Sequence, residues 1–288
     1  MHGTGAGLRD VAGSLSELEA THPEWRPWLR PLGVALASLD AAPWRGLAPV
    51  QGGDRAPADP LLHAATVPVD GRAARGLVRA VLAEALGGDA RAGLDALDAA
   101  GVLEGAVACD DGRLSALAQG VGADEAAFAA AAQLAALPLL HGCRRALEPG
   151  MPRGWSHGYC PICGAWPALV EVLGLERARR LRCGRCGAGW STEVLLCAFC
   201  GERDHGRLGA LVPDGRQGQL AWVETCAACG GYLKAVATLR GAAPEALPLE
   251  DARSVELDLA ALERGFHRPA GPGRSARIRL APAALVAG

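Results

Sequence analysis

Residues 181–201 read LRCGRCGAGWSTEVLLCAFCG and contain two Cys-x-x-Cys pairs separated by residues 187–196. One further pair of the same spacing precedes this stretch and one follows it. Eight of the ten cysteines therefore form four matched pairs: Cys160/Cys163, Cys183/Cys186, Cys197/Cys200 and Cys226/Cys229. Two intervening residues let one tight turn present both thiolates to a single tetrahedral ion, and two such turns complete a four-sulfur shell. The spacing predicts two metal sites whose ligands are these eight cysteines.

A glycine directly follows each pair, although glycine accounts for only 39 of the 288 residues. The four glycines are Gly164, Gly187, Gly201 and Gly230. Glycine adopts a positive φ at low steric cost. A turn of this kind, here called a knuckle, aims backbone N–H groups at the sulfurs and stabilises thiolate charge. The glycines therefore favour bound metal over disulfide bonds.

A catalytic dithiol is the first alternative to a metal site. Thioredoxin-like proteins place one Cys-x-x-Cys pair at a helix N-terminus after a strand, which lowers the thiol pKa, and the sequence offers none of that context. Pro161 follows the first cysteine of its pair, as in rubredoxin and zinc-ribbon knuckles. A shell closed by four protein sulfurs has no open position for water or substrate, so we predict that the protein is not an enzyme.

The assignment of the pairs to the two ions stays open. Joining consecutive pairs leaves the segments 164–182 and 201–225, each suited to a β-hairpin, and gives two consecutive rubredoxin-like ribbons. An interleaved pairing, in which the first and third pairs share an ion, is also compatible because residues 187–196 form a short connection.

The remaining candidate ligands have weaker support. His157 and His205 flank the knuckles and carry imidazoles that could replace a thiolate, but four complete pairs leave no vacancy for them. Cys109 and Cys143 lie in the N-terminal half without partners at ligand spacing, so we interpret them as core or incidental thiols.

Composition and charge leave the class of partner open. Hydrophobic residues make up 50% and charged residues 21% of the chain, as in ordinary globular proteins, and the net charge of -2 gives no general attraction for phosphate backbones.

The start MHGTGAGLRD lacks the pattern of a secretory signal. The apolar stretch 126–140 is shorter than the roughly 20 residues that span a bilayer, so it predicts a buried helix. We therefore expect a cytoplasmic protein without a membrane segment, whose compartment disfavours disulfides.

The periodicity predicts an α+β protein. In residues 1–148 apolar side chains recur at helical intervals, and helices are expected over 72–86, 89–103 and 124–147, with Asp89 and Asp124 near two helix starts. The turn-rich segment 42–60 is expected to be a loop. The predicted division has four parts: an all-helical domain (1–148), a first rubredoxin-like ribbon (149–194), a second ribbon (195–240) and a C-terminal part (241–288). The C-terminal part consists of a helix over 247–264 followed by a loose tail.

A basic stretch raises a second function class, because zinc ribbons often bind nucleic acid. Five arginines lie between residues 177 and 185: Arg177, Arg179, Arg180, Arg182 and Arg185. Few aromatic residues interleave with them, although stacking on single strands needs such rings. Compensation of the negative charge of a four-thiolate site explains the arginines equally well. Nucleic-acid binding is therefore the less favoured hypothesis.

With these motifs in view, the chain resembles the formate dehydrogenase accessory protein FdhE family. The resemblance rests on GYCPICGAWPALVEV (158–172), on the two pairs of residues 181–201 with Trp190 between them, and on TCAACGGYLKAV (225–236). The last segment contains Lys234, the only lysine in the chain. The sequence motifs are similar over residues 158–237, whereas over the N-terminal half the resemblance is limited to a helical architecture.

The resemblance implies an assembly factor, or chaperone, that contacts the catalytic subunit of a respiratory formate dehydrogenase in the cytoplasm. It also implies iron rather than zinc at the eight cysteines, although four-sulfur geometry permits both metals. A rubredoxin-like electron carrier is a third reading, because iron in such a shell can cycle between its ferrous and ferric states. Neither the client-binding residues nor the oligomeric state follows from the sequence.

Overall fold

The computed structural model describes residues 4–53, 55–87, 90–215 and 217–283, and the chain divides into two compact units. The first unit comprises Met1–Pro57, Leu61–Pro149 and Ser275–Gly288, and the second comprises Ala58–Pro60 and Gly150–Arg274. The fold class is α+β, as predicted, with N-terminal helices and two groups of four cysteines. The finer division into four parts stays a prediction.

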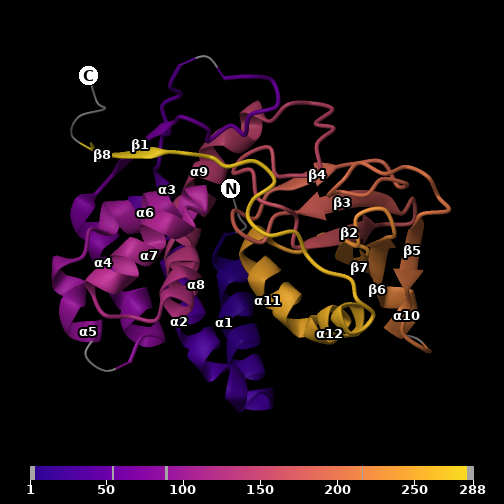
Figure 1. Cartoon of the computed structure of the whole chain (residues 1–288), viewed down its shortest axis with the longest axis horizontal. Helices are drawn as coiled ribbons and strands as arrows, with labels where there is room; N and C mark the ends of the chain where they lie inside the picture. The colour runs from indigo at the N-terminus through magenta and orange to yellow at the C-terminus, as the bar shows by residue number, and fades with distance from the viewer. Residues whose placement is uncertain (1–3, 54, 88–89, 216, 284–288) are drawn as a thin grey trace. The chain divides into compact units, whose positions relative to one another are not determined.

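The first unit is built mainly from helices (Figure 1). In chain order they are α1 (Thr4–Thr21), η1 (Pro23–Trp25), α2 (Arg26–Ser38), α3 (Ala42–Arg45), α4 (Gly71–Ala85), α5 (Ala90–Gly93), η2 (Leu94–Ala96), α6 (Ala99–Ala108), α7 (Asp111–Gly120), α8 (Glu125–Ala135), α9 (Leu137–Leu147) and η3 (Glu148–Gly150). The apolar side chains Leu29, Leu32 and Leu36 of α2 are buried, whereas Trp28 on the same helix is 38% exposed. The segment 42–60, expected to be a loop throughout, contains the one-turn helix α3.

Aspartates begin several of these helices, since their carboxylates accept hydrogen bonds from the free N–H groups of the first turn. Asp124 caps α8 as predicted and accepts from the backbone N–H of Ala127 at 2.8 Å. The single helix expected over 89–103 is instead broken, because Leu97 is extended and Asp98 caps a new helix, α6. Asp89 lies outside the described residues.

The stretch Glu125–Gly150, which contains α8 and α9, is long and apolar enough to cross a membrane by length and composition. In its most apolar window, however, 67% of the residues are buried inside the protein. Phe128 on α8 and Leu139 and Leu140 on α9 are fully buried. This burial agrees with the prediction of a core helix for residues 126–140.

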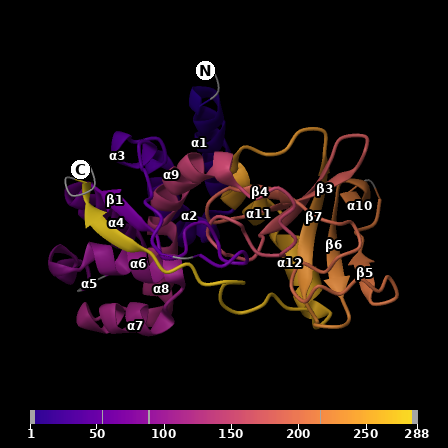
Figure 2. The same cartoon turned by 90° about the horizontal axis from the view of Figure 1, so that it is seen from above.

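The first unit also contains a two-stranded sheet that the sequence analysis did not anticipate. Strand β1 (Thr66–Val69) pairs in parallel with β8 (Arg279–Pro282), with Thr66 opposite Arg279 and Val69 opposite Pro282 (Figure 2). The N-terminal domain is therefore not helical throughout. The segment expected to be a loose tail is a strand over these residues, because β1 supplies the backbone partners that an isolated tail lacks.

The second unit is built on one six-stranded sheet of order β4-β3-β2-β7-β6-β5. Its strands are β2 (Leu169–Leu173), β3 (Ala178–Arg182), β4 (Gly189–Ser191), β5 (Leu208–Leu211), β6 (Ala221–Cys226) and β7 (Tyr232–Thr238), and α10 (Gln217–Leu220) precedes β6. Each ribbon is an antiparallel set of three strands, one strand more than the β-hairpin expected from the sequence. The two ribbons are joined side by side because β2 pairs in parallel with β7.

Two helices follow the sheet where one was expected. After η4 (Pro244–Ala246), α11 (Leu247–Arg253) ends and α12 (Val255–Glu263) begins at Ser254, whose hydroxyl donates to the carbonyl oxygens of Glu250 and Asp251. Ala261 of α12 packs in a buried cluster with Val223 of β6 and Tyr232 of β7. The helices therefore cover one face of the sheet (Figure 1).

Candidate metal centres

The four Cys-x-x-Cys turns share one backbone conformation. In each, the N–H of the glycine after the pair donates to the carbonyl oxygen of the first cysteine, at 2.9–3.0 Å. The φ values of Gly164, Gly187, Gly201 and Gly230 are 76°, 78°, 77° and 69°. These are the positive values predicted from the sequence, and a side chain at these positions would strain the turn.

The knuckles come together in consecutive pairs. The first set, here called the buried centre, is Cys160, Cys163, Cys183 and Cys186; the second, here called the exposed centre, is Cys197, Cys200, Cys226 and Cys229. Within each set all four sulfurs lie within 4.8 Å of one another. Each ribbon thus assembles its own set of sulfurs, and the interleaved pairing is not the arrangement of this structure.

The sulfur positions fit a tetrahedral metal shell. Metal–sulfur distances of about 2.3 Å require sulfur–sulfur distances of about 3.8 Å. In the buried centre the Sγ atoms of Cys160 and Cys186, and those of Cys163 and Cys183, are both 3.5 Å apart. In the exposed centre the corresponding distances are 3.8 Å (Cys197 to Cys229) and 3.7 Å (Cys200 to Cys226). Each set could hold one thiophilic ion such as iron or zinc.

The thiol pKa values of the buried centre show why it favours a cation. Burial raises the pKa of Cys160 and of Cys186 well above the usual value, whereas hydrogen bonds from neighbouring thiols, chiefly Cys160, hold the pKa of Cys183 well below it. Backbone N–H groups also approach the sulfurs: Ile162 N lies 3.4 Å from Cys160 Sγ, and Cys186 N lies 3.5 Å from Cys183 Sγ. A bound cation would let all four buried thiols ionise together.

In the exposed centre, too, burial and hydrogen bonds shift the thiol pKa values in opposite directions, but less strongly. Burial raises the pKa of Cys197 and of Cys229. At Cys226 burial acts in the same direction, but hydrogen bonds from the backbone N–H groups of Cys229 and Ala228, together with those from the Cys200 and Cys197 thiols, outweigh it and lower the pKa. The knuckle N–H groups thus favour thiolates at this centre too.

The weaker ligand candidates lie outside both sets in the described part of the chain. The ring of His157 stacks on Tyr159, with centroids 5.0 Å apart, and the side chain of His205 is 88% exposed. Cys143 is buried in α9, and Cys109 ends α6 in a left-handed conformation. The structure brings none of these four residues into a four-ligand group.

Two of the five arginines between residues 177 and 185 form ion pairs within the second unit. Arg179 pairs with Glu224 at 2.6 Å, and Arg182, which is 2% exposed, pairs with Glu171 at 2.6 Å. Arg182 also donates to the carbonyl oxygen of Gly187 in a knuckle. Because these two guanidinium groups are directed at carboxylates inside the unit, they do not contribute to a phosphate-binding surface.

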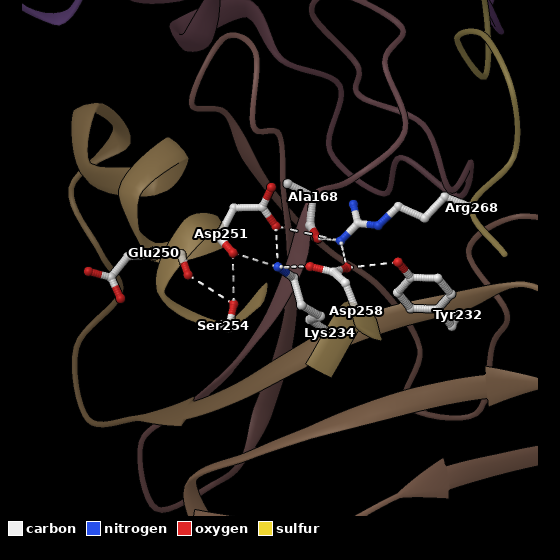
Figure 3. A network of polar contacts seen from close by, with 8 residues as sticks. All are labelled: Ala168, Tyr232, Lys234, Glu250, Asp251, Ser254, Asp258 and Arg268. Atoms are coloured by element: carbon white, nitrogen blue, oxygen red, sulfur yellow. Dashed lines mark hydrogen bonds and ion pairs between the residues drawn. The ribbon is translucent and has the colours of Figure 1, made fainter. Parts of the chain in front are cut away.

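Lys234 anchors a polar network that the sequence analysis did not foresee (Figure 3). Its fully buried Nζ lies 2.6 Å from the carbonyl oxygen of Asp251, 2.7 Å from Asp251 Oδ1 and 2.6 Å from Asp258 Oδ2. Asp258 Oδ1 accepts hydrogen bonds from Tyr232 Oη at 2.8 Å and from Arg268 at 3.1 Å. The network ties β7 to α11 and α12. A single lysine among 29 basic residues was the only sequence signal for it.

No protein-family model matches the sequence. A curated protein of Aquifex aeolicus (strain VF5), named "Protein FdhE homolog", is 34% identical over 117 residues. The aligned segment spans 39% of this chain and 40% of that protein. The crystal structure of the FdhE protein from Pseudomonas aeruginosa matches 96% of this chain and 98% of its own length, with a TM-score of 0.56 and 20% identity.

The resemblance to the FdhE family is confirmed. The two matches carry different weight. The Aquifex relative supplies the sequence likeness, over less than half of either protein. At 20% identity the Pseudomonas structure shows that the FdhE fold extends over nearly the whole chain.

Proposed function

We propose that this protein is a formate dehydrogenase accessory factor of the FdhE type, which works in the cytoplasm and binds the catalytic subunit of a respiratory formate dehydrogenase. In this proposal the eight knuckle cysteines are metal ligands, one ion is held in each centre, and the protein itself does not turn over formate. The metal-stabilised ribbons supply a rigid surface for the client enzyme.

One observation carries the proposal: two complete four-cysteine sets, each built from consecutive knuckles, occur on a fold shared with an FdhE protein. Closed four-sulfur shells suit structural or electron-transfer metals, because they leave no position for a substrate. We favour iron at both centres, on the family resemblance; zinc fits the same donor set.

The metal is identified from anaerobically purified protein by elemental analysis and absorption spectroscopy. Ferric iron in a four-thiolate shell gives a coloured protein, whereas zinc gives a colourless one because its d shell is filled, and elemental analysis also detects ferrous iron, which absorbs little visible light. We expect two iron ions per chain. A colourless protein with two zinc ions would exclude both iron and the electron-carrier alternative while leaving the accessory role open.

The partner is tested with the full chain as bait and the purified catalytic subunit of a respiratory formate dehydrogenase as prey. We expect a complex of the two proteins on size-exclusion chromatography and no formate oxidation by the chain alone. An unrelated molybdenum enzyme serves as the control prey. Equal binding to both enzymes, or to neither, would argue against the proposed client.

A further inference from the structure

The two centres differ sharply in the burial of their sulfur ligands. All four cysteines of the buried centre have an exposed fraction of 0%. In the exposed centre Cys226 is 1% and Cys197 is 8% exposed, Cys229 is half-buried and Cys200 is exposed. The donor atoms are chemically identical in the two centres. The difference in access is therefore the clearest physical difference between the two centres.

The buried centre is covered by a later part of the chain. Arg274 N donates to the carbonyl oxygen of Gly164 at 2.9 Å, and a Cβ atom placed on Gly164 would lie 1.8 Å from Arg274 O. The Arg274 side chain holds this cover in place, because its Nε and Nη2 donate to Asp59 Oδ1 at 2.9 and 2.6 Å. In the exposed centre the cover is limited to one knuckle: a Cβ atom on Gly230 would lie 2.9 Å from the side chain of His267, whereas one on Gly201, the position equivalent to Gly164, would meet nothing within 4 Å.

The exposed centre also opens on cavities. A cavity of 190 Å³ is lined by Cys197 and Cys226 together with apolar side chains that include Val194 and Leu195. Val194 and Leu195 are 69% and 54% exposed. A second cavity, of 200 Å³, reaches Cys197 beside Phe199. Small molecules can therefore approach the sulfurs of this centre without opening the fold.

We propose that the exposed centre is an exchangeable site for a thiophilic ion such as zinc or iron, whereas the buried centre retains its ion until the second unit unfolds. The inference rests on the proposed metal binding and assigns the two ions different roles. Exchange requires an incoming ligand to reach the metal or a sulfur atom. At the exposed centre access is direct, whereas at the buried centre it needs a larger opening that costs more free energy. When the exchangeable ion is lost, no metal holds the Cys197–Cys200 knuckle in place. The conformation of the surface that this knuckle forms with Val194 and Leu195 therefore depends on the supply of the ion.

The test uses the full chain, purified anaerobically, loaded with zinc and challenged with a chromogenic chelator. We expect one zinc per chain to be released at least about 100-fold faster than the second, since local opening is far more frequent than unfolding of the unit. The Cys200→Ser variant should lack the fast phase and keep the slow one. Release of both ions at a single rate would overturn the exchange proposal alone, and a chain that binds no zinc would overturn the proposed metal binding as well.

A second measurement assigns the phases without relying on variants that fold poorly. During the chelator challenge the thiols are alkylated with N-ethylmaleimide and mapped by mass spectrometry. We expect the four cysteines of the exposed centre to be labelled during the fast phase and those of the buried centre only during the slow phase. Labelling of the buried centre first, or of both centres together, would contradict the proposal.

Discussion

At the residue scale, Lys234 shows how one buried cation fixes an element to the sheet. We predict that Lys234→Met destabilises the protein by about 1–3 kcal/mol, because the substitution leaves the partly exposed Asp251 and Asp258 carboxylates with Arg268 alone as their cation. The free energy of unfolding from urea titration, followed by circular dichroism, measures the effect.

The matched control is Arg203→Met, because Arg203 pairs with Glu193 through side chains that are 57% and 62% exposed. Water screens such a pair, so this variant should unfold close to the wild type. If Lys234→Met unfolded at the same urea concentration as the control, the network would not hold α11 and α12 in place.

Two glycines of equal φ provide a second test at this scale. Gly201→Ala should cost about 1–2 kcal/mol, from the positive φ alone. Gly164→Ala adds a collision with the backbone oxygen of Arg274, so we expect a larger loss of stability and loss of the ion from the buried centre. Urea unfolding and zinc content of both variants are the measurements, and equal losses would mean that residue 274 does not cover the centre.

The knuckles were predictable from the sequence because their determinants are local. Two cysteines and the following glycine specify the turn wherever the rest of the chain goes. Lys234 was recognised only as unusual, since its partners Asp251 and Asp258 lie on helices whose packing the sequence pattern does not specify. Their alternation of charged and apolar residues is that of any surface helix.

At the element scale, β8 is the feature most distant from the predictions. It pairs with β1 across most of the chain length, and Leu280 N donates to Glu104 Oε1 at 2.8 Å. Both strands are four residues long and contain proline, at Pro68 and Pro282. Proline weakens the strand pattern, and a parallel partner far along the chain leaves no local signal.

Ending the chain after Ile278 tests the contribution of β8. Removal of the strand exposes one side of β1, where Val67 is fully buried, and leaves Glu104 without the N–H of Leu280. We expect a loss of stability of about 2 kcal/mol or more in the first unit, as for a few unsatisfied buried groups, with the metal content unchanged. Thermal unfolding with zinc analysis tests this. Unaltered stability would show that β8 contributes little to the unit.

At the scale of the whole molecule, the sheet couples the two ribbons. The structure brings consecutive knuckles together, whereas the sequence predicted two hairpin ribbons and left open which knuckles share an ion. The sequence could not predict the union of the ribbons, because the parallel register of Leu169 with Lys234 joins segments that belong to different hairpins. The pairing of β2 with β7 makes one six-stranded sheet, so the ribbons should not unfold independently.

Replacement of Cys160 and Cys163 by serine tests this coupling. Loss of the buried centre should disorder β2 and β3, and through β2 it should loosen β7 and weaken zinc binding at the exposed centre. The helices of the first unit should persist. Limited proteolysis and zinc titration of the variant are the measurements. Full affinity at the exposed centre would show that the ribbons are energetically independent.

The central claim is that eight cysteines in four knuckles hold two ions. Native mass spectrometry of the full chain, purified anaerobically without added metal, tests it most directly. We expect a mass that corresponds to the chain plus two metal ions, with all eight knuckle thiols free for alkylation after acid removes the ions. A chain that carries no metal and has disulfide bonds between the knuckle cysteines would contradict it.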